Sequence, residues 1–315
     1  MADPATAGVV RARDGRSGPG RPVVVVGDVG LDVIAAPRTP IAWHTDTPSN
    51  VSMVSGGAGG NTAAWLADAG AEVAVLGRVG HDAAGVTLRA ELETAGVRAV
   101  LAVDEQLPTC IVVCVVEPDG ERSMFPDRGA NSAFAPADAR LDEAVPNWSA
   151  RGVIPHLHLS AYVLFDPGSR SGGLAALARA RERGWTTSVD PQAASLITRV
   201  GPATFLQWVD GVDLLLPNES EVDALGGLAV LLERGHEVAV TSGAAGARWL
   251  GAGIDLRVDA PQIRCVDTTG AGDAFDGGLL ARWARDGDRL AALSAGVATG
   301  SRAAAQVGAR PTAEG

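Results

Sequence analysis

The sequence contains no lysine, and all 26 of its basic residues are arginine. This absence excludes several classes of enzyme, because a Walker A phosphate loop, a protein-kinase strand lysine, a pyridoxal Schiff base and a class I aldolase all need a lysine amine. Cysteine is scarce, and Cys110, Cys114 and Cys265 show neither CxxC pairing nor the spacing of zinc ligands. We therefore expect a reduced, cytoplasmic setting.

Positive charge is also short overall, because 37 acidic residues face 26 basic ones and leave a formal net charge of -11. Such a balance offers no attractive field to nucleic acid or to an anionic membrane. No apolar stretch reaches membrane-spanning length. Residues 1–22 are rich in Gly, Pro, Ala and Arg, so we expect a disordered tail there and neither a signal peptide nor an anchor.

Short apolar runs alternate with alanine-rich segments from residue 23 onward. The valine run at 23–26 is typical of a parallel strand that is buried on both faces. Further strands are expected at 73–76, 157–159, 186–189, 212–216 and 238–241, and helices at 61–69, 84–95, 168–183 and 271–285. Strands that alternate with helices predict a doubly wound, mostly parallel α/β sheet in one domain at 23–315.

Two stretches break this alternation, at 34–55 and 98–124, where β-type composition continues without an intervening helix. They predict a small antiparallel sheet at the edge of the main domain, which would act as a lid that covers a ligand and excludes water. Such a lid would expose apolar side chains, among them Ile41, Ile111 and Val113. Because self-association would cover these side chains, the pattern predicts a homodimer through the lid.

The most informative stretch is D-T-T-G-A-G-D at 267–273, which follows a strand-like segment and opens a helix. Gly270, Ala271 and Gly272 would present backbone N–H groups at the helix N-terminus, where anions bind favourably. A carboxylate beside an anion site is costly unless it has a function. Asp273 is placed to accept a proton from a hydroxyl that attacks a phosphoryl group. The alternative interpretation is a helix cap after a glycine-rich turn.

This stretch resembles the second signature of the ribokinase-like (PfkB-type) carbohydrate kinase family, in which the last Asp is the catalytic base. Three further stretches resemble family motifs in the same order, namely G-G-A-G-G-N at 56–61, N-E-S-E at 218–221 and T-S-G-A-A-G at 241–246. The resemblance covers roughly 23–312. It implies a kinase that moves the γ-phosphoryl group of ATP to a primary hydroxyl of a sugar, with Mg²⁺ as cofactor.

The resemblance also implies substrate contacts. Asp32, Gly56, Gly57 and Asn61 would bind the sugar, and the glycines would let the backbone approach a polyol closely. The return from the lid resembles the ribokinase branch of the family, so Asn131 is expected near the substrate. A strand-end cap is the alternative for Asp32, and a plain glycine-rich helix start is the alternative for the loop.

The nucleotide contacts would come from the two later motifs. The resemblance implies ATP contacts for Asn218, Thr241, Gly243 and Gly246. Glu221 would organise Mg²⁺ through water, and an ordinary solvated helix position is the alternative for this residue. A plain turn between strands is the alternative for the threonine and glycine motif.

A monovalent-cation site is implied as well. Asp267 and Thr269 match family positions at such a site, near the turn at 308–309. A bound K⁺ would add to the positive field of the backbone amides. The chain has no lysine amine that could do the same. The resemblance therefore implies K⁺ activation.

Departures from the family pattern leave the substrate open. Ribokinases proper usually have Asn at the position of Gly30 and Lys at the position of Ala58, and an acidic residue is absent at 160–162. A nucleoside kinase of the same fold is the alternative enzyme. A catalytically silent sugar- or nucleotide-binding regulator is the alternative outside the enzymes. His156 and His158 alternate on a strand without a third metal ligand, so a structural or substrate-edge role is expected for them rather than a metal site.

Overall fold

The computed structural model describes residues 20–116 and 122–312. Within these residues, nine strands form one large sheet. In chain order these strands are β1 Val23–Val26, β4 Val73–Gly80, β5 Arg98–Asp104, β8 His156–Ser160, β9 Thr186–Asp190, β10 Leu214–Leu215, β11 Glu237–Thr241, β12 Ala247–Gly251 and β13 Ile254–Val258. Their order across the sheet is β13-β12-β11-β10-β9-β8-β1-β4-β5.

The strands from β5 to β11 run parallel, and β12 and β13 add an antiparallel hairpin at one edge. All four valines of β1 are fully buried, because helices cover both faces of the sheet. The predicted doubly wound, mostly parallel sheet is confirmed. The strand-like segment at 263–266 is not a strand, and the backbone N–H of Val266 donates to the carbonyl of Ala304 instead.

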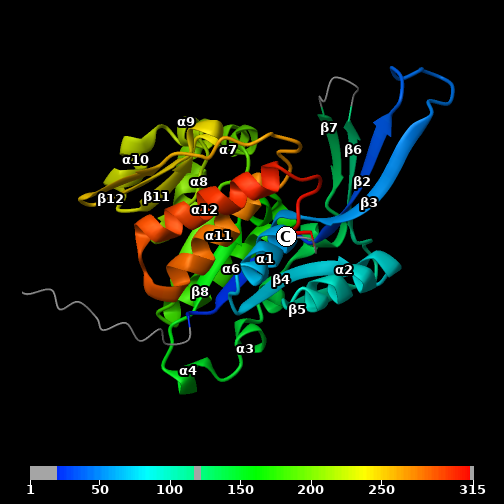
Figure 1. Cartoon of the computed structure of the whole chain (residues 1–315). Helices are drawn as coiled ribbons and strands as arrows, with labels where there is room; N and C mark the ends of the chain where they lie inside the picture. The colour runs from blue at the N-terminus through cyan, green and yellow to red at the C-terminus, as the bar shows by residue number, and fades with distance from the viewer. Residues whose placement is uncertain (1–19, 117–121, 313–315) are drawn as a thin grey trace, which may run out of the picture.

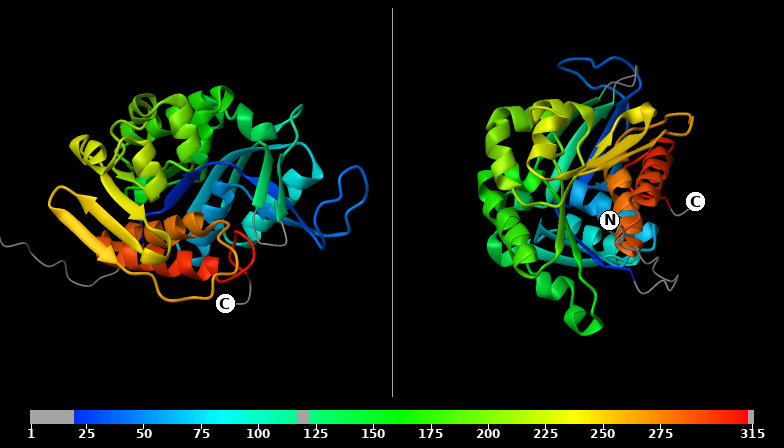
Figure 2. Two further views of the ribbon diagram at one scale, coloured as in Figure 1. Left: turned by 90° about the horizontal axis from the view of Figure 1, so that it is seen from above. Right: turned by 90° about the vertical axis from the view of Figure 1, so that its left-hand side faces the viewer.

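Figure 2 shows a helical layer on each side of the large sheet. One layer consists of α1 Ala58–Asp68, α2 Ala83–Thr94, α11 Ala271–Asp286 and α12 Arg289–Ala304. The other layer consists of α3 Leu141–Ala144, α4 Trp148–Arg151, α5 Tyr162–Phe165, α6 Pro167–Glu182, α7 Ala194–Val200, α8 Pro202–Trp208, α9 Glu219–Ala224 and α10 Leu228–Glu233. The short 3-10 turns are η1 Gly129–Ala133, η2 Pro136–Asp138 and η3 Gly243–Ala245. No helix in the described part of the chain is long and apolar enough to cross a membrane.

A second, smaller sheet stands off the main body (Figure 1). It consists of β2 Gly30–Pro37, β3 Ser49–Gly56, β6 Cys110–Val116 and β7 Arg122–Asp127, in the order β3-β2-β6-β7. We call this sheet the lid. Its outer pairs are antiparallel as expected, but the central pair of β2 and β6 is parallel.

The expected boundaries of the lid need correction. Residues 98–104 belong to the large sheet, because β5 pairs with β4 in parallel after the crossover through α2. The first lid segment begins at Gly30, before the expected residue 34. Part of the expected second segment, at 117–121, lies outside the described residues, as do residues 1–19 of the expected tail. Gly20–Pro22 are ordered at the end of that tail, since the N–H of Arg21 donates to the carbonyl of Ala284.

Candidate active site

One cavity of about 920 Å³ lies where the carboxyl ends of the parallel strands meet the lid. The strand order reverses between β1 and β8, and ligands of open α/β sheets bind at such a switch point. Residues at or just after the ends of β1, β8, β9, β10 and β11 line the cavity, and β6 and β7 of the lid contribute to its opposite wall. The strand ends therefore bring the separate sequence motifs together.

The start of α11 forms one end of the cavity. Gly270 has a left-handed backbone with φ 71°, and a Cβ there would meet the backbone of Ala309 at 2.8 Å. Gly270 and Gly272 line the cavity. Ala271 differs from the expected anion site, because its amide already donates to the carbonyl of Thr268 at 3.2 Å.

Asp273 lies in the first turn of α11 and faces the same cavity. Its Oδ2 accepts a hydrogen bond from Nδ2 of Asn61 at 2.9 Å. Burial raises the pKa of Asp273 from 3.8 to about 7, while hydrogen bonds from Asn61 and Gln192 act to lower it. A carboxyl group with a pKa near neutrality is suited to general-base catalysis.

Besides Asp32, three more carboxyl groups lie near this base. Burial raises the pKa of Glu221 to about 7, and it raises the pKa of Asp190 and of Asp276 well above the ordinary range. The nearby carboxylates of Asp190 and Asp273 add to the effect of burial and raise the pKa of Asp276 further. Within the described residues, no arginine forms an ion pair with Asp190, Glu221 or Asp273.

This concentration of buried negative charge fits a divalent cation. Within residues 20–116 and 122–312, however, no three His, Cys, Asp or Glu side chains come close enough together to hold a metal ion by themselves. Mg²⁺ usually keeps several waters and is held by one or two carboxylates together with substrate phosphates. The donor set around Asp190 and Glu221 agrees with that mode of binding.

Gln192 is a residue that the sequence motifs missed. Its backbone is left-handed with φ 70°, which is uncommon outside glycine. Its N–H and Nε2 both donate to Asp190, at 2.8 and 2.6 Å, and its side chain also hydrogen-bonds to Asp273. The usable signal in the sequence is an Asp at the carboxyl end of a parallel strand, since Asp190 ends β9.

The residues expected to bind nucleotide are partly gathered at the cavity. Asn218, Glu221 and Thr241 line it, and Asn218 pairs with Thr241 in an isolated parallel bridge. Gly243 and Gly246 do not line it. They begin and cap the 3-10 turn η3, which follows β11.

Glu221 forms a capping box with Asn218. Its Oε2 accepts from the Asn218 backbone N–H at 2.9 Å, and its Oε1 accepts from Nδ2 at 2.7 Å. Only 3% of Glu221 is exposed, so the alternative of a solvated helix position is wrong.

On the substrate side, Asp32, Gly57 and Asn61 line the cavity. Gly56 lies directly against the side chain of Asp32, and a Cβ at Gly56 would collide with the Asp32 carboxylate. Asn131 does not line the cavity, contrary to the expectation. Its Nδ2 donates to the carbonyl of Val29 at 3.0 Å, and its Oδ1 accepts from the Val29 N–H at 3.4 Å. Asn131 therefore braces the end of β1.

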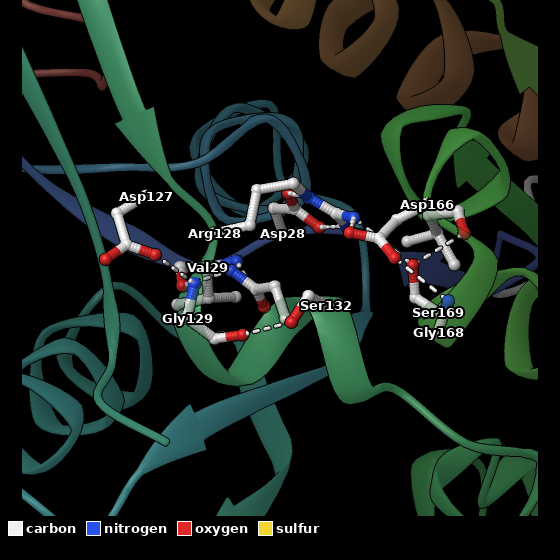
Figure 3. A network of polar contacts seen from close by, with 11 residues as sticks. Asp28, Val29, Asp127, Arg128, Gly129, Ser132, Asp166, Gly168 and Ser169 are labelled. Carbon is white, nitrogen blue, oxygen red and sulfur yellow. Dashed lines mark hydrogen bonds and ion pairs between the residues drawn. The ribbon is translucent and has the colours of Figure 1, made fainter.

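Arg128, at the end of the lid, opens the stretch 128–131 that resembles the ribokinase branch, but the resemblance assigns it no role (Figure 3). Its Nη2 and Nε donate to the two carboxylate oxygens of Asp28 at 2.7 and 2.8 Å. Its Nη1 lies 3.3 Å from Oδ2 of Asp166, which caps α6. All three side chains line the cavity, so this ion-pair cluster joins the lid to both halves of the main domain.

The proposed monovalent-cation residues lie beside the C-terminal segment. Oδ1 of Asp267 accepts from the N–H of Thr269 at 2.7 Å, and its Oδ2 accepts from the N–H of Gly308 at 3.1 Å. The two segments expected to meet at this site are therefore adjacent.

The two histidines are buried and do not line the cavity. Both rings are buried and hydrogen-bond to Oγ of Ser188, at 2.8 Å from His156 and 2.9 Å from His158. Burial lowers the pKa of His158 to about 3, so this ring is neutral and supplies no countercharge to the nearby carboxyl pair.

Comparisons with known proteins agree with this geometry. The pfkB family carbohydrate kinase model matches residues 21–314. An ATP-dependent ribose-1-phosphate kinase of Halopiger xanaduensis is 33% identical over 93% of this chain and 95% of that protein. A probable sugar kinase from Rhizobium etli has a TM-score of 0.82 at 24% identity, over 94% of this chain and 96% of that chain. A fructokinase from Vibrio cholerae, solved with fructose, ADP and potassium ion, has a TM-score of 0.74 at 25% identity, over 93% and 95% of the two chains. The chain is therefore a carbohydrate kinase of the pfkB family.

Proposed function

We propose that this kinase transfers the γ-phosphoryl group of ATP to a primary hydroxyl of a sugar, with Asp273 as the general base. The observation that carries the proposal is the buried Asp273 carboxylate, which faces the cavity beside the glycine-rich start of α11. A pKa of about 7 lets this group accept a proton at neutral pH.

The proposed reaction uses residues from both sides of the cavity. Asp32 and Asn61 hold the sugar hydroxyls, and the lid excludes water. Asp273 accepts the proton of the acceptor hydroxyl while that oxygen attacks the γ-phosphorus and the bond to the β-phosphate oxygen breaks. The backbone amides of Gly270 and Gly272, at the positive end of the α11 dipole, stabilise the charge that develops on the phosphoryl oxygens.

We assign the nucleotide side to the ends of β10 and β11. Asn218 and Thr241 line the cavity there, and the turn that contains Gly243 and Gly246 extends their surface. Asp190 and Glu221 are the residues that would hold Mg²⁺, mainly through water. When bound, Mg²⁺ would neutralise charge on the phosphates of ATP.

The acceptor is tested by measuring ADP release over a panel of ribose, fructose, ribose 1-phosphate and nucleosides. Ribose 1-phosphate is included because the relative from Halopiger is named for it. Nucleosides are included because Tyr162, Phe165 and Pro167 give one wall of the cavity an apolar and aromatic character. Release with a free or phosphorylated sugar supports the proposal, and release with nucleosides alone identifies a nucleoside kinase. No release with any acceptor would favour a silent regulator.

We expect K⁺ to activate the enzyme. Asp267 lies beside the anion-binding end of α11, and a monovalent cation there would add to its positive field. The initial rate should rise when Na⁺ or a bulky organic cation is replaced by K⁺ at constant ionic strength. The variant Asp267→Asn should lose this response. Equal rates in all three salts would contradict the assignment.

We also expect a homodimer through the lid. The face of the lid that points away from the cavity exposes 69% of Met53 and 60% of Phe125, together with Val51 and Val113. Light scattering at micromolar concentration should give the mass of a dimer. The double variant Met53→Asp, Phe125→Asp should be monomeric, whereas Val86→Asp, an exposed apolar position on α2, should not change the mass. A monomeric wild type would refute this interface.

A further inference from the structure

Arg310 lies in the segment that follows α12, and the described residues of this segment contact α1 through Trp65 and Asn61. Its Nη2 donates to the carbonyl of Gly56 at 3.0 Å, and its Nε donates to Oδ1 of Asn61 at 3.3 Å. The segment itself is held in place, because Nε1 of Trp65 donates to the carbonyl of Ala309 at 2.8 Å. The guanidinium is thus fixed between the end of β3 and the first turn of α1.

This contact decides which way the Asn61 amide faces. An amide has one oxygen, which accepts, and one nitrogen, which donates. Because Oδ1 of Asn61 receives the hydrogen bond from Arg310, Nδ2 is left to face Oδ2 of Asp273 at 2.9 Å. A flipped amide would place its nitrogen against a cation and its oxygen against a carboxylate. Both of those contacts are unfavourable.

Arg310 also supplies positive charge that the stretch at 56–61 lacks, since this stretch contains only glycine, alanine and asparagine. The charged groups around Asp273 are Asp32 from β2, Asp190 from β9, Glu221 from α9, Asp276 from α11 and Arg310. Arg310 is the cation in this set. It acts to lower the pKa of Asp32 and of Asp273 against the effect of burial. Burial lowers the pKa of Arg310 itself to about 10, so it stays charged at neutral pH.

We propose that Arg310 is a positioning residue, which orients the Asn61 amide toward the base and supplies positive charge near the Asp273 carboxylate. The inference rests on the proposed role of Asp273. Arg310 does not line the cavity, so it acts through Asn61 and through its charge.

The test compares Arg310→Met, Arg310→Lys and wild type by kcat and kcat/KM as functions of pH. In Arg310→Met the acid limb that reports Asp273 should move up by about one unit, so the rate at about pH 6 should fall about tenfold. The rate should recover toward wild type as the pH rises above the new midpoint. The KM for ATP should not change, and Arg310→Lys should restore part of the shift. A purely structural loss would lower the rate equally at every pH.

A second variant displaces the guanidinium without removing it. A Cβ on Gly60 would collide with Nη2 of Arg310, and alanine favours the helix more than glycine does. Gly60→Ala should therefore reproduce the shift of the acid limb. The control is Arg282→Gln, which removes an arginine of an exposed ion pair further along α11 and should leave the profile unchanged.

The outcomes separate this inference from the proposed function. A folded Arg310→Met enzyme with the wild-type profile would overturn the role of Arg310, even if Asp273→Asn is inactive. If Arg310→Met does not fold, Gly60→Ala decides, and a wild-type profile in that variant overturns the inference. An active Asp273→Asn enzyme would instead refute the proposed base.

Discussion

Replacing Asp273 with asparagine should lower kcat by about 10² to 10⁴-fold, which is the usual contribution of a general base. Asparagine keeps the shape of the side chain but cannot accept the proton of the acceptor hydroxyl. Binding of ATP and of the sugar should persist, because Asp32, Asn61 and Thr241 are unchanged. Steady-state kinetics together with calorimetric titration of both ligands would measure the two effects. A folded variant with near wild-type turnover would show that Asp273 is not the base.

The same substitution should stabilise the fold at alkaline pH. The pKa of Asp273 is raised from 3.8 to about 7 in the folded protein, so the folded state binds the proton more tightly than the unfolded state does. The wild type therefore loses stability as the pH rises from about 4 through 7, and asparagine has no proton to lose. The melting temperature of Asp273→Asn should exceed that of wild type at about pH 8, and the gap should narrow toward about pH 5. If the difference in melting temperature were the same at both pH values, the titration of Asp273 would not be its cause.

Replacing Arg128 with methionine should lower the free energy of unfolding by about 3 to 5 kcal/mol at neutral pH, which is typical when one partner of a buried ion pair is removed. The change leaves the Asp28 carboxylate, with only 9% of its side chain exposed, without its bidentate partner. It also releases Asp166 (Figure 3). Urea unfolding, followed by circular dichroism, would measure the loss.

A double-mutant cycle provides the control for this prediction. In the Arg128→Met background, Asp28→Asn should recover much of the lost stability, because it removes the unpaired buried charge. The matched variant Arg183→Met, which breaks a largely exposed pair with Asp142, should cost less than about 1 kcal/mol. Equal losses in Arg128→Met and Arg183→Met would show that the ion-pair cluster does not join the lid to the domain energetically.

Much of the fold could be predicted because local patterns specify it. The valines of β1 need burial on both faces, and the glycine-rich start of α11 follows from residues adjacent in sequence. The error at 98–104 arose from the same local view. The apolar pattern of β5 does not show to which sheet it belongs. That follows only from its pairing with β4, and α2 separates the two strands in the sequence.

The missed site residues depend on contacts between distant segments. Arg128 meets Asp28 across 100 residues of sequence, and Arg310 meets Asn61 across 249. No spacing rule connects such positions, because the fold alone makes them neighbours. Gln192 was missed for a different reason. Its backbone is left-handed, and a glutamine in the sequence gives no indication of that conformation.

The attachment of the C-terminal segment to the start of α11 has a consequence for biosynthesis. Gly308 binds Asp267, Ala309 fills the space that Gly270 leaves, and Arg310 reaches Asn61. A nascent chain that has emerged only as far as α12 can assemble the large sheet and still lack these contacts. Phosphoryl transfer at neutral pH should therefore reach its full rate only when residue 310 has left the ribosome.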